Sequence, residues 1–222
     1  MESISPSLRS LAFALAIGML GGCAQITYDR VPMDAPRPSA TESLSNCGGE
    51  LPVSGRCLAL VRASQWFSET GLQVATGERY RISVPAGQAW FDADRRNVPP
   101  KGEKGSWLMN RFAHLKRQEC SDWFSLIAVV RDKSGEPIGT AFDVSGAHIN
   151  GEIAIDAKGS LAMYPNDAES TNEVRDYFYQ NNHGQAWVVI TRCGPSCDSG
   201  LSVPLQSGSP SPARNDRCAK SR

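Results

Sequence analysis

The sequence has no excess of charge of either sign. It contains 23 lysine and arginine residues, 23 aspartate and glutamate residues and three histidines, so its formal net charge is +0. Attraction to nucleic acid or to an anionic membrane surface depends on an excess of basic residues. The composition therefore argues against nucleic acid as a partner, and it leaves membrane attachment to a covalent lipid alone.

Motifs of catalysis are also missing. The chain contains no Gly-x-Ser-x-Gly elbow, no His-Glu-x-x-His pair and no glycine-rich phosphate loop. Its acidic residues are spread along a neutral chain, so no two of them stand out as the carboxylate pair of a glycosidase. We therefore expect a protein that is not an enzyme.

The chain also lacks long apolar runs: no stretch approaches the 18 residues that a membrane-spanning helix needs. One shorter run, residues 11–20, suits the core of a signal peptide. It ends in Leu-Gly-Gly-Cys at residues 20–23, which resembles a bacterial lipobox. The resemblance implies cleavage before Cys23 and diacylation of its sulfur, for example with palmitate. The alternative is an ordinary secretory signal followed by an incidental cysteine.

Ala24 follows the cysteine in place of an aspartate. In lipoproteins of this type, that residue implies sorting to the bacterial outer membrane. We therefore expect the mature chain to be anchored there by its lipid, on the periplasmic or the surface face.

Six cysteines remain after Cys23, and an even number in an exported chain predicts disulfides. They are Cys47, Cys57, Cys120, Cys193, Cys197 and Cys218. A zinc site would need paired Cys-x-x-Cys spacings or nearby histidines, and the chain has neither. Cys47–Cys57 and Cys193–Cys197 would close local loops, but the sequence leaves the pairing open.

Composition divides the chain into four parts. Residues 1–22 form the lipoprotein signal peptide, and residues 23–46, rich in proline, serine and alanine, form a lipidated, disordered tether. Residues 47–203 form the folded domain. Residues 204–222 form a flexible tail, which Cys218 can attach to the domain.

Short strand-like segments separated by turn residues fill the folded domain. Several alternate apolar and polar residues, which is typical of half-buried strands; examples are 71–74, 80–84, 124–130, 152–155, 160–164 and 186–190. Residues 124–130 and 186–190 are continuously apolar and belong at the centre. Residues 107–117 are compatible with a short helix or an ordered loop. The pattern predicts an all-β sandwich.

The order of features from about residue 61 to 192 resembles the bacterial calcium-dependent galactophilic lectin. The segments that carry this resemblance include 89–92 (Ala-Trp-Phe-Asp), 123–127 (Trp-Phe-Ser-Leu-Ile), 159–167 (Gly-Ser-Leu-Ala-Met-Tyr-Pro-Asn-Asp) and 179–184 (Tyr-Gln-Asn-Asn-His-Gly). It implies a galactose-binding-like, jelly-roll type of antiparallel β-sandwich with a carbohydrate as its ligand.

Asp167, Asn181 and Asn182 offer one carboxylate and two amide oxygens on two loops. Calcium takes six to eight such oxygens, and sugar hydroxyls can complete its coordination. The resemblance implies that these three residues are calcium ligands, with backbone carbonyls near Phe178 and at 92–93. We expect Asp167 to be an exposed loop carboxylate. In the alternative interpretation, 181–184 is only a tight turn.

Further ligand contacts are expected from Asp92 and Trp107. Asp92 begins the acidic cluster 92–94. In the alternative interpretation, this cluster is only a solvated turn. Trp107 follows a polar loop, so we expect it to be partly exposed and to contact the sugar. Trp90 and Trp123 lie in strand-like runs and are expected in the core.

Two functional hypotheses follow from these observations. The first is a lipid-anchored carbohydrate-binding module that uses calcium to hold a sugar. The second is a non-catalytic structural lipoprotein whose lectin-like domain binds no metal and contacts another envelope protein. The two hypotheses differ in whether the loops of Asp167 and Asn181–Asn182 converge.

Overall fold

The chain divides into two units, Met1–Pro32 and Met33–Arg222. The computed structural model describes residues 37–92, 95–144, 152–170 and 177–194, all within the second unit. The expected signal peptide, Cys23 and the tail 204–222 therefore lie outside the described residues. Among the described residues, no helix is long and apolar enough to cross a membrane.

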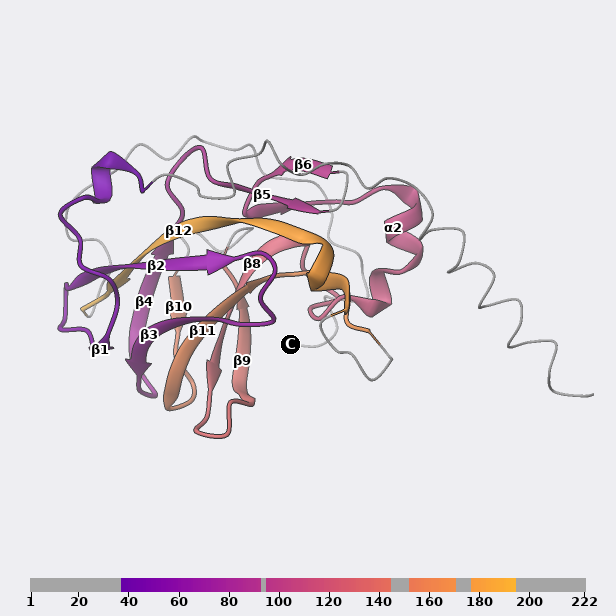
Figure 1. The fold of residues 1–222 in the computed structure, drawn as a ribbon. Coiled ribbons are helices and arrows are strands. Elements are labelled where there is room, and N and C mark those ends of the chain that lie inside the picture. Colours follow the sequence, from indigo (N-terminus) through magenta and orange to yellow (C-terminus); the bar gives the residue numbers. More distant parts are fainter. Residues whose placement is uncertain (1–36, 93–94, 145–151, 171–176, 195–222) are drawn as a thin grey trace, which may run out of the picture. The chain divides into compact units, whose positions relative to one another are not determined.

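Two six-stranded sheets make up the described fold (Figure 1). The first, called here the β8 sheet, has the order β1-β3-β11-β8-β7, with β9 also paired to β8. Its strands are β1 (Gly49–Glu50), β3 (Ser68–Val74), β7 (Lys101–Glu103), β8 (Trp123–Arg131), β9 (Pro137–Asp143) and β11 (Gly159–Pro165). All of its pairings are antiparallel except that of β1 with β3.

The second, the β12 sheet, has the order β10-β4-β12-β5-β6, with β2 also paired to β12. Its strands are β2 (Arg56–Arg62), β4 (Arg79–Ser83), β5 (Ala89–Asp92), β6 (Arg95–Val98), β10 (Glu152–Ala154) and β12 (Asn182–Arg192). All of these pairings are antiparallel. The expected mostly-β, sandwich-like architecture is thus confirmed.

The main core collects side chains from both sheets. Fully buried members include Leu126, Ala128, Val130, Leu161, Met163, Ala186, Val188 and Ile190. A second cluster, formed by Ile127, Val129, Ala162 and Tyr164, lies on the opposite face of the β8 sheet. Strand β8 is therefore buried on both faces, which explains its continuously apolar sequence. The prediction that 124–130 and 186–190 are central strands is confirmed.

Residues 107–117, for which the sequence allowed a short helix or an ordered loop, contain the short helix α2 (Trp107–Arg111). The 3-10 turn η2 (Ala113–Leu115) follows it. The Ser106 side chain caps α2 by accepting a hydrogen bond from the backbone N–H of Met109. The indole of Trp123 donates to Asn110 Oδ1 at 3.3 Å, which attaches α2 to the core. Trp90 and Trp123 are buried, as predicted.

A disulfide joins Cys47 to Cys57, as one of the expected local loops. Cys120 and Cys193 are also disulfide-bonded, whereas Cys197 and Cys218 lie outside the described residues.

Ten residues of the expected tether, 37–46, are described. They include the 3-10 turn η1 (Ser39–Thr41), in which the side chain of Thr41 is buried.

Candidate cation site

Three segments that are distant in sequence meet at one end of the β12 sheet. Strand β12 pairs with β5 so that Asn182 lies opposite Asp92. The 3-10 turn η4 (Tyr177–Asn181) leads directly into β12, and Asp167 follows the end of β11. The topology therefore brings together four of the residues that the sequence analysis selected.

Hydrogen bonds connect these four residues in two pairs. The side-chain amide of Asn182 donates to Asp167 Oδ2 at 2.8 Å, and the amide of Asn181 donates to Asp92 Oδ1 at 3.3 Å. The other carboxylate oxygen of Asp167 accepts the backbone N–H of Ala168 at 2.7 Å. The loops of Asp167 and Asn181–Asn182 thus converge.

The expectation that Asp167 is an exposed loop carboxylate is wrong, because its exposed fraction is 5%. Asn166 holds the chain in place directly after β11. Its Oδ1 accepts the Gln118 N–H at 2.9 Å, and its Nδ2 donates to the Asp122 carbonyl at 3.0 Å. The Arg117 N–H also donates to the Asp167 carbonyl at 3.1 Å. These bonds hold the end of β11 against residues 117–122 and turn Asp167 inward.

The burial of Asp167 has an electrostatic consequence. Desolvation, together with the charge of the nearby Asp92, raises the pKa of its carboxyl from 3.8 to about 7. Hydrogen bonds from Asn182 and Ala168 and the charge of Arg117 act in the opposite direction. Two carboxylates that interact unfavourably therefore lie beside two amides.

The amide oxygen of Asn182 is buried and has no hydrogen-bond partner in the described part of the chain. Buried polar atoms are nearly always paired, so an orphaned oxygen in such a cluster calls for a hydrogen-bond donor or a cation. Carboxylate and amide oxygens are the ligands that calcium prefers. The donor set therefore fits calcium. Two of its four side chains are amides. The described residues contain no cluster of three or more histidine, cysteine or acidic residues that could hold a metal.

The two other predicted contact residues, Phe178 and Trp107, lie in the helical elements η4 and α2. Phe178 lies within η4, and its half-buried side chain packs against the core. Trp107 begins α2 and is 74% exposed, as its position after a polar loop predicted. Ala93, whose backbone carbonyl was a further expected ligand, lies outside the described residues.

Sequence reasoning missed two residues behind the site, Tyr179 and Arg117. The hydroxyl of the fully buried Tyr179 donates to the Pro165 carbonyl at 2.7 Å and accepts the Asp167 N–H at 3.4 Å. It also accepts a hydrogen bond from Arg117 Nη1 at 3.2 Å. Nothing in the local sequence distinguishes Arg117 from an ordinary surface cation, because its partners lie far away in the chain.

No family model, no curated protein and no solved structure matches this chain. The function is therefore argued from the geometry of the site and from the sequence pattern.

Proposed function

We propose that this is a lipid-anchored, non-catalytic carbohydrate-binding protein of the bacterial outer membrane. In this proposal Asp92, Asp167, Asn181 and Asn182 hold a calcium ion. The observation that carries the proposal is the buried Asp167–Asn182 pair, with its orphaned amide oxygen, directly beside Asp92. The resemblance of segments 159–167 and 179–184 to the galactophilic lectin supports the same assignment.

The electrostatics of the cluster favour a cation. Ionising a buried carboxylate next to a second carboxylate is costly unless a positive charge compensates for both. Asp167 and Asp92 supply the charge, and the amide oxygens of Asn181 and Asn182 supply neutral ligands that need little desolvation. Bound calcium would provide open coordination positions for vicinal sugar hydroxyls.

One observation favours the structural alternative. The Asn182–Asp167 and Asn181–Asp92 hydrogen bonds already connect β12 to the loop after β11 and to β5 without an ion. A network of this kind can fix the mutual position of two loops in a protein that only contacts an envelope partner. In that case calcium would change neither stability nor binding.

Calcium-dependent melting separates the two functions. A ligand that binds only the native state raises the melting temperature with its concentration. We expect calcium, at concentrations on the order of millimolar, to raise the melting temperature of the wild-type protein. The Asp167→Asn variant should show no such rise, whereas Glu119→Gln, an exposed carboxyl outside the cluster, should respond like the wild type. A wild-type protein whose melting temperature ignores calcium favours the structural alternative.

A further inference from the structure

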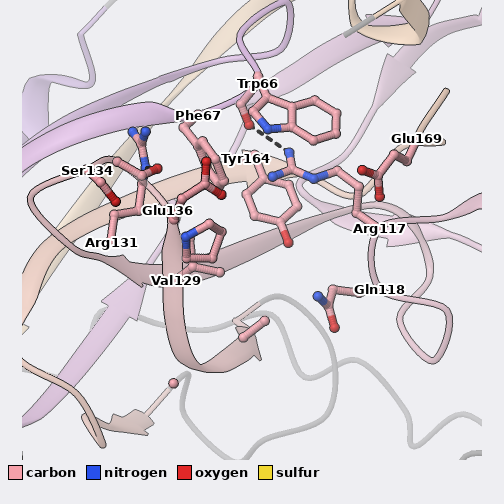
Figure 2. Close-up of a pocket in the computed structure, with 14 residues that line it drawn as sticks. Trp66, Phe67, Arg117, Gln118, Val129, Arg131, Ser134, Glu136, Tyr164 and Glu169 are labelled. Atoms are coloured by element: carbon pink, nitrogen blue, oxygen red, sulfur yellow. Dashed lines mark hydrogen bonds between the residues drawn. The ribbon is translucent and has the colours of Figure 1, made fainter. Parts of the chain in front are cut away.

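A second candidate site lies on the face of the β8 sheet opposite the main core. It is a cavity of about 480 Å³ whose lining includes Trp66, Phe67, Arg117, Glu136, Tyr164 and Glu169 (Figure 2). None of the four residues of the cation site lines this cavity. Its size lies within the usual range for small-molecule sites.

Arg117 is held firmly in the wall of the cavity. Its guanidinium carbon lies 3.7 Å from the ring centre of Trp66 and 3.5 Å from that of Tyr164. Its Nη1 donates to the Trp66 carbonyl at 2.7 Å and to the Tyr179 hydroxyl at 3.2 Å. A guanidinium has five N–H donors, and the described part of the chain provides no acceptor for those on Nε and Nη2.

The second arginine of the cavity, Arg131, is paired with a carboxylate. Its Nε donates to the Gly135 carbonyl at 2.6 Å, and its Nη1 forms an ion pair with Glu69. Its guanidinium also packs over Phe67, 4.3 Å from the ring centre. Within the described residues, Arg117 is therefore the arginine of this wall that has no carboxylate partner.

Two carboxylates line the same cavity. Glu136 comes from the β8–β9 hairpin, and Glu169 lies beside Arg117 in Figure 2. Within the described residues, neither carboxylate has a hydrogen-bond or ion-pair partner. The cavity thus presents donors on one cation and acceptors on two anions, next to aromatic side chains.

We propose that this cavity is a second saccharide-binding site, which takes a neutral sugar and does not need calcium. A hydroxyl group both donates and accepts, so adjacent sugar hydroxyls can satisfy Arg117 and the two glutamates together. A carboxylate ligand would be repelled by Glu136 and Glu169, whereas hydroxyls carry no charge and match both kinds of wall group. The proposal extends the proposed carbohydrate-binding function to a site that is independent of its cation.

The test is a titration of the full-length chain in EDTA with neutral methyl hexopyranosides and disaccharides, followed by saturation-transfer NMR and tryptophan fluorescence. We expect dissociation constants on the order of millimolar for at least one neutral sugar. Glucuronate should bind several-fold more weakly, because its carboxylate meets Glu136 and Glu169. The proposal is overturned if no neutral sugar binds, or if glucuronate binds more tightly than its neutral counterpart.

Variants locate the binding and separate it from the cation site. Glu169→Gln, Glu136→Gln and Arg117→Lys should each weaken sugar binding in EDTA several-fold, and the two glutamine variants keep the test valid if Arg117→Lys fails to fold. Asp167→Asn and the exposed Glu119→Gln should leave this binding unchanged. Unaltered binding in both glutamine variants contradicts the proposal. If calcium has no effect but sugar binding in EDTA persists, only the proposed cation site fails.

Discussion

At the scale of single residues, the behaviour of Asp167 depends on burial rather than on its place in a loop. The sequence indicated a polar turn after a strand, and it selected Asp167 and Asn182 through their resemblance to a known ligand set. Their burial could not be predicted, because it depends on Asn166, Arg117 and Tyr179, whose partners lie up to 62 residues away. A local pattern carries no information on such contacts.

The raised pKa of Asp167 predicts a particular pH dependence of stability in EDTA. In the folded protein the pKa is about 7, above its ordinary value of 3.8, so the protonated form is favoured by folding. The corresponding stability is fully present below about pH 4 and is lost as the pH rises through 7. At about 1.4 kcal/mol per pKa unit, the loss approaches roughly 4 kcal/mol.

Asp167→Asn should remove this component of the pH dependence. The orphaned Asn182 oxygen can accept the new amide if the Asn182 side chain turns over, so the bond between the two residues persists. Urea unfolding of both proteins from pH 4 to pH 8 measures the effect. We expect the free energy of unfolding of the variant, relative to that of the wild type, to be larger at pH 8 than at pH 4. A wild-type profile as flat as that of the variant would contradict the assigned pKa.

At the scale of elements, the sequence predicted the apolar strands β8 and β12 but not the polar edge strand β6. The predicted segments 124–130 and 186–190 lie within β8 and β12, because strands buried on both faces or at a sheet centre need apolar side chains. Strand β6, Arg95–Val98, carries a polar sequence, and within the described residues it pairs only with β5. Its pairing depends on its neighbour, so periodicity gave no indication of it.

The same distinction explains why one candidate site was predicted and the other was not. The candidate cation site lies at the ends of β5 and β11 and at the start of β12, where polar residues next to apolar runs are visible in the sequence. The cavity around Arg117 combines residues from the β2–β3 loop, the loop before β8 and the β8–β9 hairpin. Those segments meet only in the folded protein, and none of them carries a motif.

At the scale of the whole molecule, a two-sheet domain follows the segment that carries the expected lipid anchor. The Cys47–Cys57 disulfide and the bonded Cys120 and Cys193 agree with an exported chain, because disulfides persist in oxidising compartments. The proposal assigns membrane attachment to a lipid on Cys23, because residues 20–23 resemble a lipobox.

The anchor has a direct test in the native host envelope. Mass spectrometry of the membrane fraction should find a mature chain that begins at Cys23 and carries acyl groups, because the Leu-Gly-Gly-Cys sequence resembles a lipobox. Cys23→Ser should prevent the acylation, whereas Cys57→Ser, a change at a disulfide cysteine, should leave it intact. An unprocessed N-terminus with an unmodified Cys23 would rule out the lipid anchor.

The central claim is that calcium binds between Asp167 and the Asn181–Asn182 turn, and the side-chain amide resonances of the two asparagines test it most directly. Calcium should shift these signals in the ¹⁵N-labelled protein, because their amide oxygens become ligands, and the shifts should saturate with one ion per chain. They should be absent in Asp167→Asn and retained in Glu119→Gln. If the Asn181 and Asn182 amide signals of the wild-type protein stay unchanged in millimolar calcium, the cation site does not exist.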